Sequence, residues 1–161
     1  MANNKMIGYS ALIGVLTGLR SLTPVAVVSQ ASAGKGLRLR NDKLQYLRKK
    51  EVANTFTALA AGELVADKLP FVPSRTTAGP LLARVALGAV CGAALADSAK
   101  LEPVRGALAG AAGALAGTFG GYHVRRLFTQ ELDIPDFAVA LVEDAVAIGC
   151  SLGLVSAITR R

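Results

Sequence analysis

The sequence has few of the bulky side chains that usually fill the core of a water-soluble protein. It contains no Trp, and aromatic residues make up only 5% of the chain. Hydrophobic residues nevertheless reach 52%, mostly as Ala, Leu and Val, and 17 residues are Gly. Soluble domains are usually less apolar than this. Small residues also suit close contact between helices better than a bulky core. We therefore expect an integral membrane protein.

Residues typical of metal, redox or catalytic sites are also scarce. Cys91 and Cys150 lie far apart in apolar runs, and neither has a second Cys or a His at metal-ligand spacing. Both are predicted to be small buried hydrophobic residues. The sequence has no nucleophile elbow, phosphate-binding loop or dinucleotide-binding glycine motif. We expect no enzymatic activity, cofactor or metal.

The positive charge is concentrated in one segment. The net charge is +7, and seven of the 18 basic residues fall within residues 35–50. Such an excess suggests nucleic acid in a soluble protein, but only Tyr46 supplies an aromatic ring in this segment. We therefore expect a cytoplasmic loop that contacts anionic lipid, and no nucleic-acid partner.

Five apolar stretches are each near the ~20 residues needed to cross a bilayer. Polar or proline-containing breaks separate them. Because the stretches are rich in Ala and Gly and carry charges, each is expected to face protein on most sides. The prediction is an all-α, polytopic transmembrane helix bundle that forms a single domain over residues 1–161. The five stretches cover residues 6–33, 52–70, 79–98, 105–127 and 137–158.

The distribution of basic residues predicts an orientation for five spans. An odd number of spans places the two termini on opposite sides of the membrane. With the basic loop in the cytoplasm, the N-terminus lies outside and the C-terminus inside. This arrangement places about 11 basic residues on the cytoplasmic side and about 5 outside.

Short sequence matches also suggest an internal repeat. Residues 14–20 align with residues 117–123, and residues 58–63 align with residues 138–143. If residues 6–70 and 105–158 are two copies, an intervening span makes them antiparallel, as in the inverted repeats of many transporters. The alternative is chance similarity between helices rich in Ala and Gly.

Glycines form a stripe along the fourth stretch, spaced by three or four residues. Such a stripe lets another helix approach closely, within the chain or between copies. Shorter versions occur at three pairs: Gly14 and Gly18, Gly88 and Gly92, and Gly149 and Gly153. A homo-oligomer is therefore expected. The stripe consists of Gly106, Gly110, Gly113, Gly117 and Gly121.

Six of the charged residues inside the apolar stretches are candidates for a buried site. An unpaired charge in hydrocarbon costs several kcal/mol, so these side chains must face one another, water or a ligand. They either form a substrate-binding site near mid-membrane or make structural ion pairs that hold the bundle together. The six are Arg20, Glu63, Asp67, Arg84, Glu143 and Asp144.

The first stretch contains a candidate helix break. Thr23 followed by Pro24 is a favourable N-cap and first residue for a new half-helix. The exposed amides of such a break, with Arg20 nearby, would suit a carboxylate or phosphate, and Thr23 joins the predicted substrate-binding residues. The alternative is an ordinary proline kink.

His123 is the only histidine and lies close to Arg125 and Arg126. It is a candidate for a proton relay. Alternatively, the three residues mark the lipid head-group boundary.

Three strings in the chain are distinctive: "GLRSLTP" ending at Pro24, "GELVADKLP" ending at Pro70, and "VEDAVAIG" ending at Gly149. On these strings the chain resembles an uncharacterised family of small bacterial membrane proteins, the domain-of-unknown-function family 4126. The resemblance implies a multi-span bacterial membrane protein. We expect it to lie in the inner membrane. It supplies no activity and no binding residues.

Two functional hypotheses follow. The first is a transporter or channel for a small ion, an organic solute or a lipid head group, with the charged residues at its site. The second is a non-catalytic scaffold that binds lipid or a partner, in which the buried charges are structural.

Overall fold

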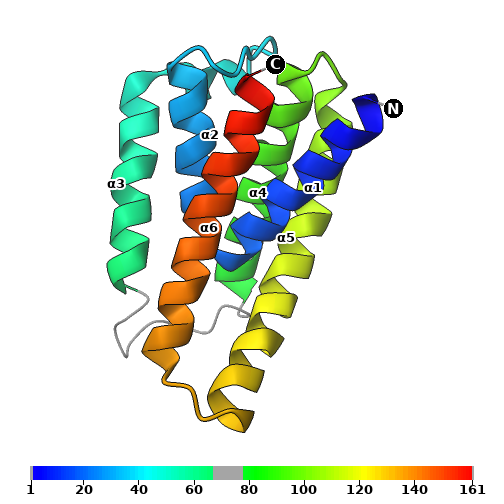
Figure 1. Cartoon of the computed structure of the whole chain (residues 1–161). Helices are drawn as coiled ribbons and strands as arrows, with labels where there is room; N and C mark the ends of the chain where they lie inside the picture. Colours follow the sequence, from blue (N-terminus) through cyan, green and yellow to red (C-terminus); the bar gives the residue numbers. More distant parts are fainter. Residues whose placement is uncertain (1, 67–77, 161) are drawn as a thin grey trace.

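The computed structural model describes residues 2–66 and 78–160. These ranges hold six α-helices and no strand, which confirms the all-α class. The helices run alternately in opposite directions along one bundle (Figure 1). Two short helices, η1 (Leu44–Arg48) and η2 (Leu127–Glu131), lie in connections. The six are α1 (Ala2–Leu19), α2 (Thr23–Ala33), α3 (Lys50–Ala66), α4 (Ala78–Ser98), α5 (Pro103–Arg126) and α6 (Asp136–Thr159).

The first predicted span is in fact two antiparallel helices. The last turn of α1 closes with a 2.9 Å bond from the Arg20 amide to the Leu16 carbonyl, and α2 begins at Thr23. Pro24 cannot donate a bond to the carbonyl of Arg20 and would clash with it, so one continuous helix is disfavoured here. The chain reverses direction between α1 and α2, which makes six helices rather than five.

The reversal changes where the termini lie. The start of α1 and the end of α6 are at the same end of the bundle (Figure 1). Five spans would place them at opposite ends. The repeat hypothesis gains no support, because residues 6–70 contain parts of three α-helices and residues 105–158 parts of only two.

The glycine stripe of α5 packs against two neighbouring helices. A Cβ atom added to Gly110 would lie 2.1 Å from the carbonyl oxygen of Gly88 in α4. One added to Gly117 would lie 2.1 Å from the carbonyl oxygen of Val15 in α1. The predicted packing role is therefore confirmed within the chain. At Gly149 and Gly153 of α6, an added Cβ would meet nothing within 4 Å.

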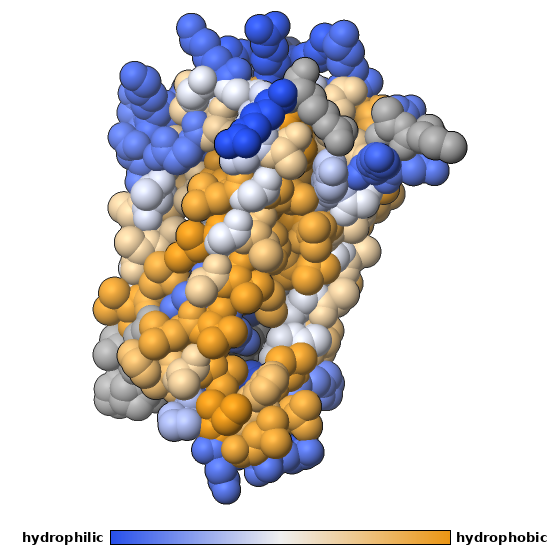
Figure 2. Space-filling view, in the orientation of Figure 1, coloured by the Kyte–Doolittle hydropathy of each residue, from blue (hydrophilic) through white to orange (hydrophobic). Residues whose placement is uncertain are grey.

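Large apolar side chains cover much of the outer surface. Figure 2 shows a broad apolar band between ends that are more hydrophilic. Leu82, Leu108 and Val142 are each more than half exposed. Monomeric soluble proteins rarely expose contiguous apolar areas of this kind. Cys91 is buried as predicted. The same prediction is wrong for Cys150, which is exposed on α6. An apolar run in the sequence does not reveal which face of the helix points outward.

Two helices of the described ranges, α4 and α6, are long and apolar enough to cross a membrane. As described, the other four helices are either shorter or less apolar than these two. α2 has 11 residues, and the described part of α3 has 17. The structure thus supports two candidate spans where the sequence predicted five.

Candidate functional site at the helix reversal

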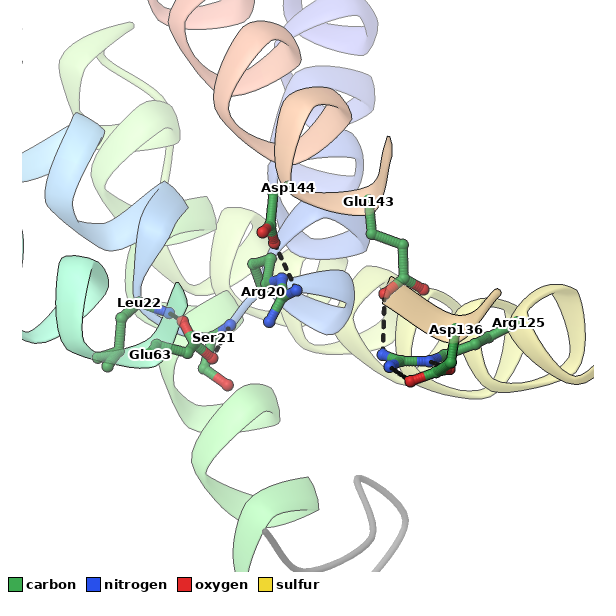
Figure 3. A network of polar contacts seen from close by, with 8 residues as sticks. All are labelled: Arg20, Ser21, Leu22, Glu63, Arg125, Asp136, Glu143 and Asp144. Carbon is green, nitrogen blue, oxygen red and sulfur yellow. Dashed lines mark hydrogen bonds and ion pairs between the residues drawn. The ribbon is translucent and has the colours of Figure 1, made fainter. Parts of the chain in front are cut away.

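Arg20 lies at the centre of the reversal and is fully buried, with 0% exposure. Its guanidinium forms an ion pair with Asp144 of α6 (Figure 3). A buried charge is tolerated only where a partner compensates for the lost water. The structure therefore brings together two of the predicted charges, from helices far apart in the sequence.

Glu63 of α3 contacts the backbone of the reversal. Its Oε1 accepts a 2.9 Å bond from the Ser21 amide, and its Oε2 accepts a 2.8 Å bond from the Leu22 amide (Figure 3). The N-cap position of α2 is Leu22, and no side-chain cap within the segment is present. The prediction that Thr23 caps α2 is wrong, because a carboxylate from another helix satisfies these amides instead.

Arg84 of α4 contacts the other side of the reversal. Its Nη1 donates a 2.9 Å bond to the carbonyl oxygen of Gly18, near the end of α1. The hydroxyl of Thr118 donates to the same oxygen over 3.4 Å. A helix carries partial negative charge at its C-terminus and partial positive charge at its N-terminus. Arg84 thus places a positive charge at the negative end of α1, and Glu63 places a negative charge at the positive end of α2.

A second polar cluster lies between the end of α5 and the start of α6. Arg125 donates to both carboxylate oxygens of Asp136, over 2.7 and 2.6 Å. Its Nη1 lies 3.5 Å from Oε2 of Glu143. Glu143 and Asp144 are adjacent in sequence but point to different clusters (Figure 3). The sequence analysis considered Arg125 only as a marker of the lipid head-group boundary. Its position before the α5–α6 connection, with Asp136 directly after it, was the available signal for this ion pair.

An apolar groove of about 460 Å³ opens between α1, α5 and α6. It exists because α1 ends at Leu19 while α5 and α6 continue past that level (Figure 1). Figure 2 shows a hollow among apolar side chains on this face. Among the described lining residues, Glu143 is the only charged one. The groove reaches Leu19, the residue before Arg20.

Three predicted residues stand apart from these contacts. Asp67 lies outside the described residues. Thr23 is buried in the first turn of α2, and its hydroxyl has no hydrogen-bond partner among the described residues. His123 is exposed near the end of α5, where its ring packs edge-on against that of Tyr122.

The sequence interpretation missed Asp97, a buried residue in the last turn of α4. Its Oδ2 accepts bonds from the amides of Arg40 and Asn41, at 2.6 and 3.1 Å. A carboxylate is disfavoured at a helix C-terminus by the helix dipole. An acidic residue at this position was therefore the available signal that a partner lies nearby.

The family model described as "Domain of unknown function (DUF4126)" matches residues 7–157. The chain belongs to this family. No curated protein and no solved structure matches the chain. The family description assigns no activity, so a functional proposal for this DUF4126 member rests on its geometry.

Proposed function

We propose that this DUF4126 member is embedded in the bacterial inner membrane with both termini in the cytoplasm. The exposed apolar band and the two apolar helices support the embedding. Lys5, the 35–50 segment and Lys100 all belong to the end of the bundle where the termini lie. The positive-inside rule places that end in the cytoplasm, which replaces the expectation of an external N-terminus.

Within that membrane, we propose that the protein transports a small solute. The observation that carries this proposal is the chain reversal between α1 and α2, where charged residues of α3, α4 and α6 converge on a break. Non-helical backbone within a bilayer is tolerated where protein or a cavity surrounds it. In many secondary transporters, helix ends at the depth of the membrane also form the substrate site.

The charged residues divide into two roles under this proposal. Arg20, Glu63, Arg84 and Asp144 stabilise the reversal, because each contacts it or pairs within it. Glu143 is the proposed solute contact, because it lines the groove that reaches the reversal. A small ion, an organic solute or a lipid head group remains the proposed cargo.

The test is flux through proteoliposomes that contain the full chain. Rb⁺ uptake and a pH-sensitive dye would serve as probes for cation and proton movement. We expect Glu143→Gln to lower flux at least tenfold, because it removes the groove's charge while preserving its shape. Glu131→Gln is the matched control, since Glu131 is exposed at the same end of the bundle. Equal flux in both variants and the wild type would contradict this role for Glu143.

The alternative is a membrane scaffold that binds lipid or a partner. The observation that favours it is the pairing of Arg20 with Asp144 next to the capped start of α2. As a scaffold, the protein would show no flux, whereas Asp144→Asn would lower its stability and release co-purified lipid. A homo-oligomer is proposed in both cases, because Gly149 and Gly153 leave a smooth exposed surface on α6.

A further inference from the structure

The segment between α2 and α3 is fastened to the bundle by apolar anchors. Leu37, Leu39 and Leu47 are 1%, 4% and 7% exposed, and all three belong to the hydrophobic core. The segment lies at the end of the bundle that holds the termini (Figure 1). Burying a leucine side chain is favourable because it removes apolar surface from water. These leucines therefore hold the segment against the helices.

Asp97 fixes the middle of the same segment. Its carboxylate accepts the amide hydrogens of Arg40 and Asn41, and the carboxylate itself is buried at the end of α4. A charged acceptor makes such bonds roughly twice as strong as neutral ones. The backbone at residues 40 and 41 is thus tied to α4 by Asp97, and the buried Leu37 and Leu39 flank Arg38.

The consequence is a surface from which every cationic side chain points outward. Leu37 and Leu39 are buried, and the alternating residues Arg38 and Arg40 are exposed. Tyr46 is 63% exposed, and the ammonium of Lys49 lies 4.4 Å from the centre of its ring. We call this surface the basic platform. Its exposed cationic residues are Lys35, Arg38, Arg40, Lys43, Arg48, Lys49 and Lys50.

We infer that the basic platform binds the head groups of anionic phospholipids in the leaflet around the bundle. Basic residues next to a cytoplasmic membrane surface each gain about 1 kcal/mol from anionic lipid. An exposed tyrosine suits the head-group region, where its ring is partly apolar and its hydroxyl is hydrated. This inference rests on the proposed membrane embedding and not on transport.

The experiment measures lipid bound to the purified full chain in detergent by native mass spectrometry. Phosphatidylglycerol is compared with phosphatidylcholine as the zwitterionic probe. We expect selective retention of phosphatidylglycerol, and about thirty-fold weaker binding in the Arg38→Gln, Arg40→Gln double variant. Arg38→Lys combined with Arg40→Lys is the matched control, because it keeps both positive charges and should not change binding. Equal retention of the two lipids would overturn the inference.

A second variant tests whether lipid binding depends on the ordered arrangement of the basic platform or only on its number of positive charges. Asp97→Ala adds one unit of net positive charge but removes the bonds to Arg40 and Asn41. Charge alone predicts tighter binding of phosphatidylglycerol, whereas the platform predicts weaker binding. Tighter binding would overturn the platform. If Asp97→Ala does not fold, the double arginine variant still decides the question.

Two competitors identify the source of the recognised anion. Inorganic phosphate at millimolar concentration should leave the lipid bound, and polyuridylate should not displace it. Displacement by either would overturn the assignment to lipid in favour of a free phosphate or a nucleic acid. None of these measurements uses flux, so failure of the transport proposal would leave their outcome unchanged.

Discussion

At the scale of single residues, Glu63 shows how a distant side chain completes a local structure. The amides of Ser21 and Leu22 both bond to its carboxylate, although Glu63 lies 42 and 41 residues further along the chain, respectively. We expect Glu63→Ala to lower the free energy of unfolding by about 1–2 kcal/mol, the usual cost of losing a helix cap. Thermal unfolding in detergent measures this loss. Glu131→Ala should leave the midpoint unchanged, and equal effects of the two substitutions would argue against the cap.

The pair of Arg20 and Asp144 should behave as a coupled unit. Removing one partner of a buried ion pair costs about 3–5 kcal/mol, because the other charge stays buried without it. We expect Arg20→Met alone to unfold or strongly destabilise the chain, and Arg20→Met combined with Asp144→Leu to recover much of the loss. A double-mutant cycle on unfolding in detergent measures the coupling. Strictly additive effects would show that the pair is not a unit.

Part of this residue pattern could be predicted from the sequence and part could not. Arg20, Arg84 and Asp144 stood out because a charge in an apolar helix needs a partner. Asp97 and Arg125 did not, because each lies near a helix end, where a charge usually reaches water. The partners themselves depend on how the helices pack, which no local pattern specifies.

At the scale of helices, we expect a Gly→Ala substitution to have opposite effects on stability in the α5 stripe and at the exposed glycines of α6. Gly110→Ala should destabilise the bundle by several kcal/mol, because the new methyl group meets backbone atoms of Gly88. Gly149→Ala should have almost no effect on the folded monomer, because its surroundings are open. Thermal unfolding of the two variants in detergent compares them directly. A larger loss for Gly149→Ala would contradict the packing described.

Helix positions were largely predictable, but one helix direction was not. The predicted stretches at residues 79–98 and 105–127 match α4 and α5 closely, since the turn between them ends in Pro103. Residues 6–33 form one apolar run, so they were predicted as one span. Pro24 signals a break but does not tell whether the chain continues or reverses. The reversal is stabilised by Glu63 and Arg84, which lie outside that run.

At the scale of the whole molecule, small and polar residues lie inside the bundle and many large apolar ones lie outside. Arg20 and Ser10 are fully buried, whereas Leu108 and Val142 are exposed. In water such an arrangement would expose apolar surface at a high cost in free energy. In a bilayer it is favourable, since lipid tails solvate the outer side chains and the inner charges pair. The composition led to the prediction of a membrane environment, which stays a proposal, whereas the six-helix topology required the structure.

The most direct test of membrane embedding and of the reversal is labelling with a membrane-impermeant maleimide in intact cells. Asn3→Cys, Lys43→Cys and Gln130→Cys report on the bundle ends, and all three positions are exposed. We predict that Gln130→Cys reacts from outside and that Asn3→Cys and Lys43→Cys react only after permeabilisation. Native Cys150 should react in neither case, because lipid or a second copy of the chain covers it within the bilayer. Labelling of Asn3→Cys from outside while Lys43→Cys stays protected would contradict the reversal, and ready labelling of Cys150 would contradict the membrane embedding itself.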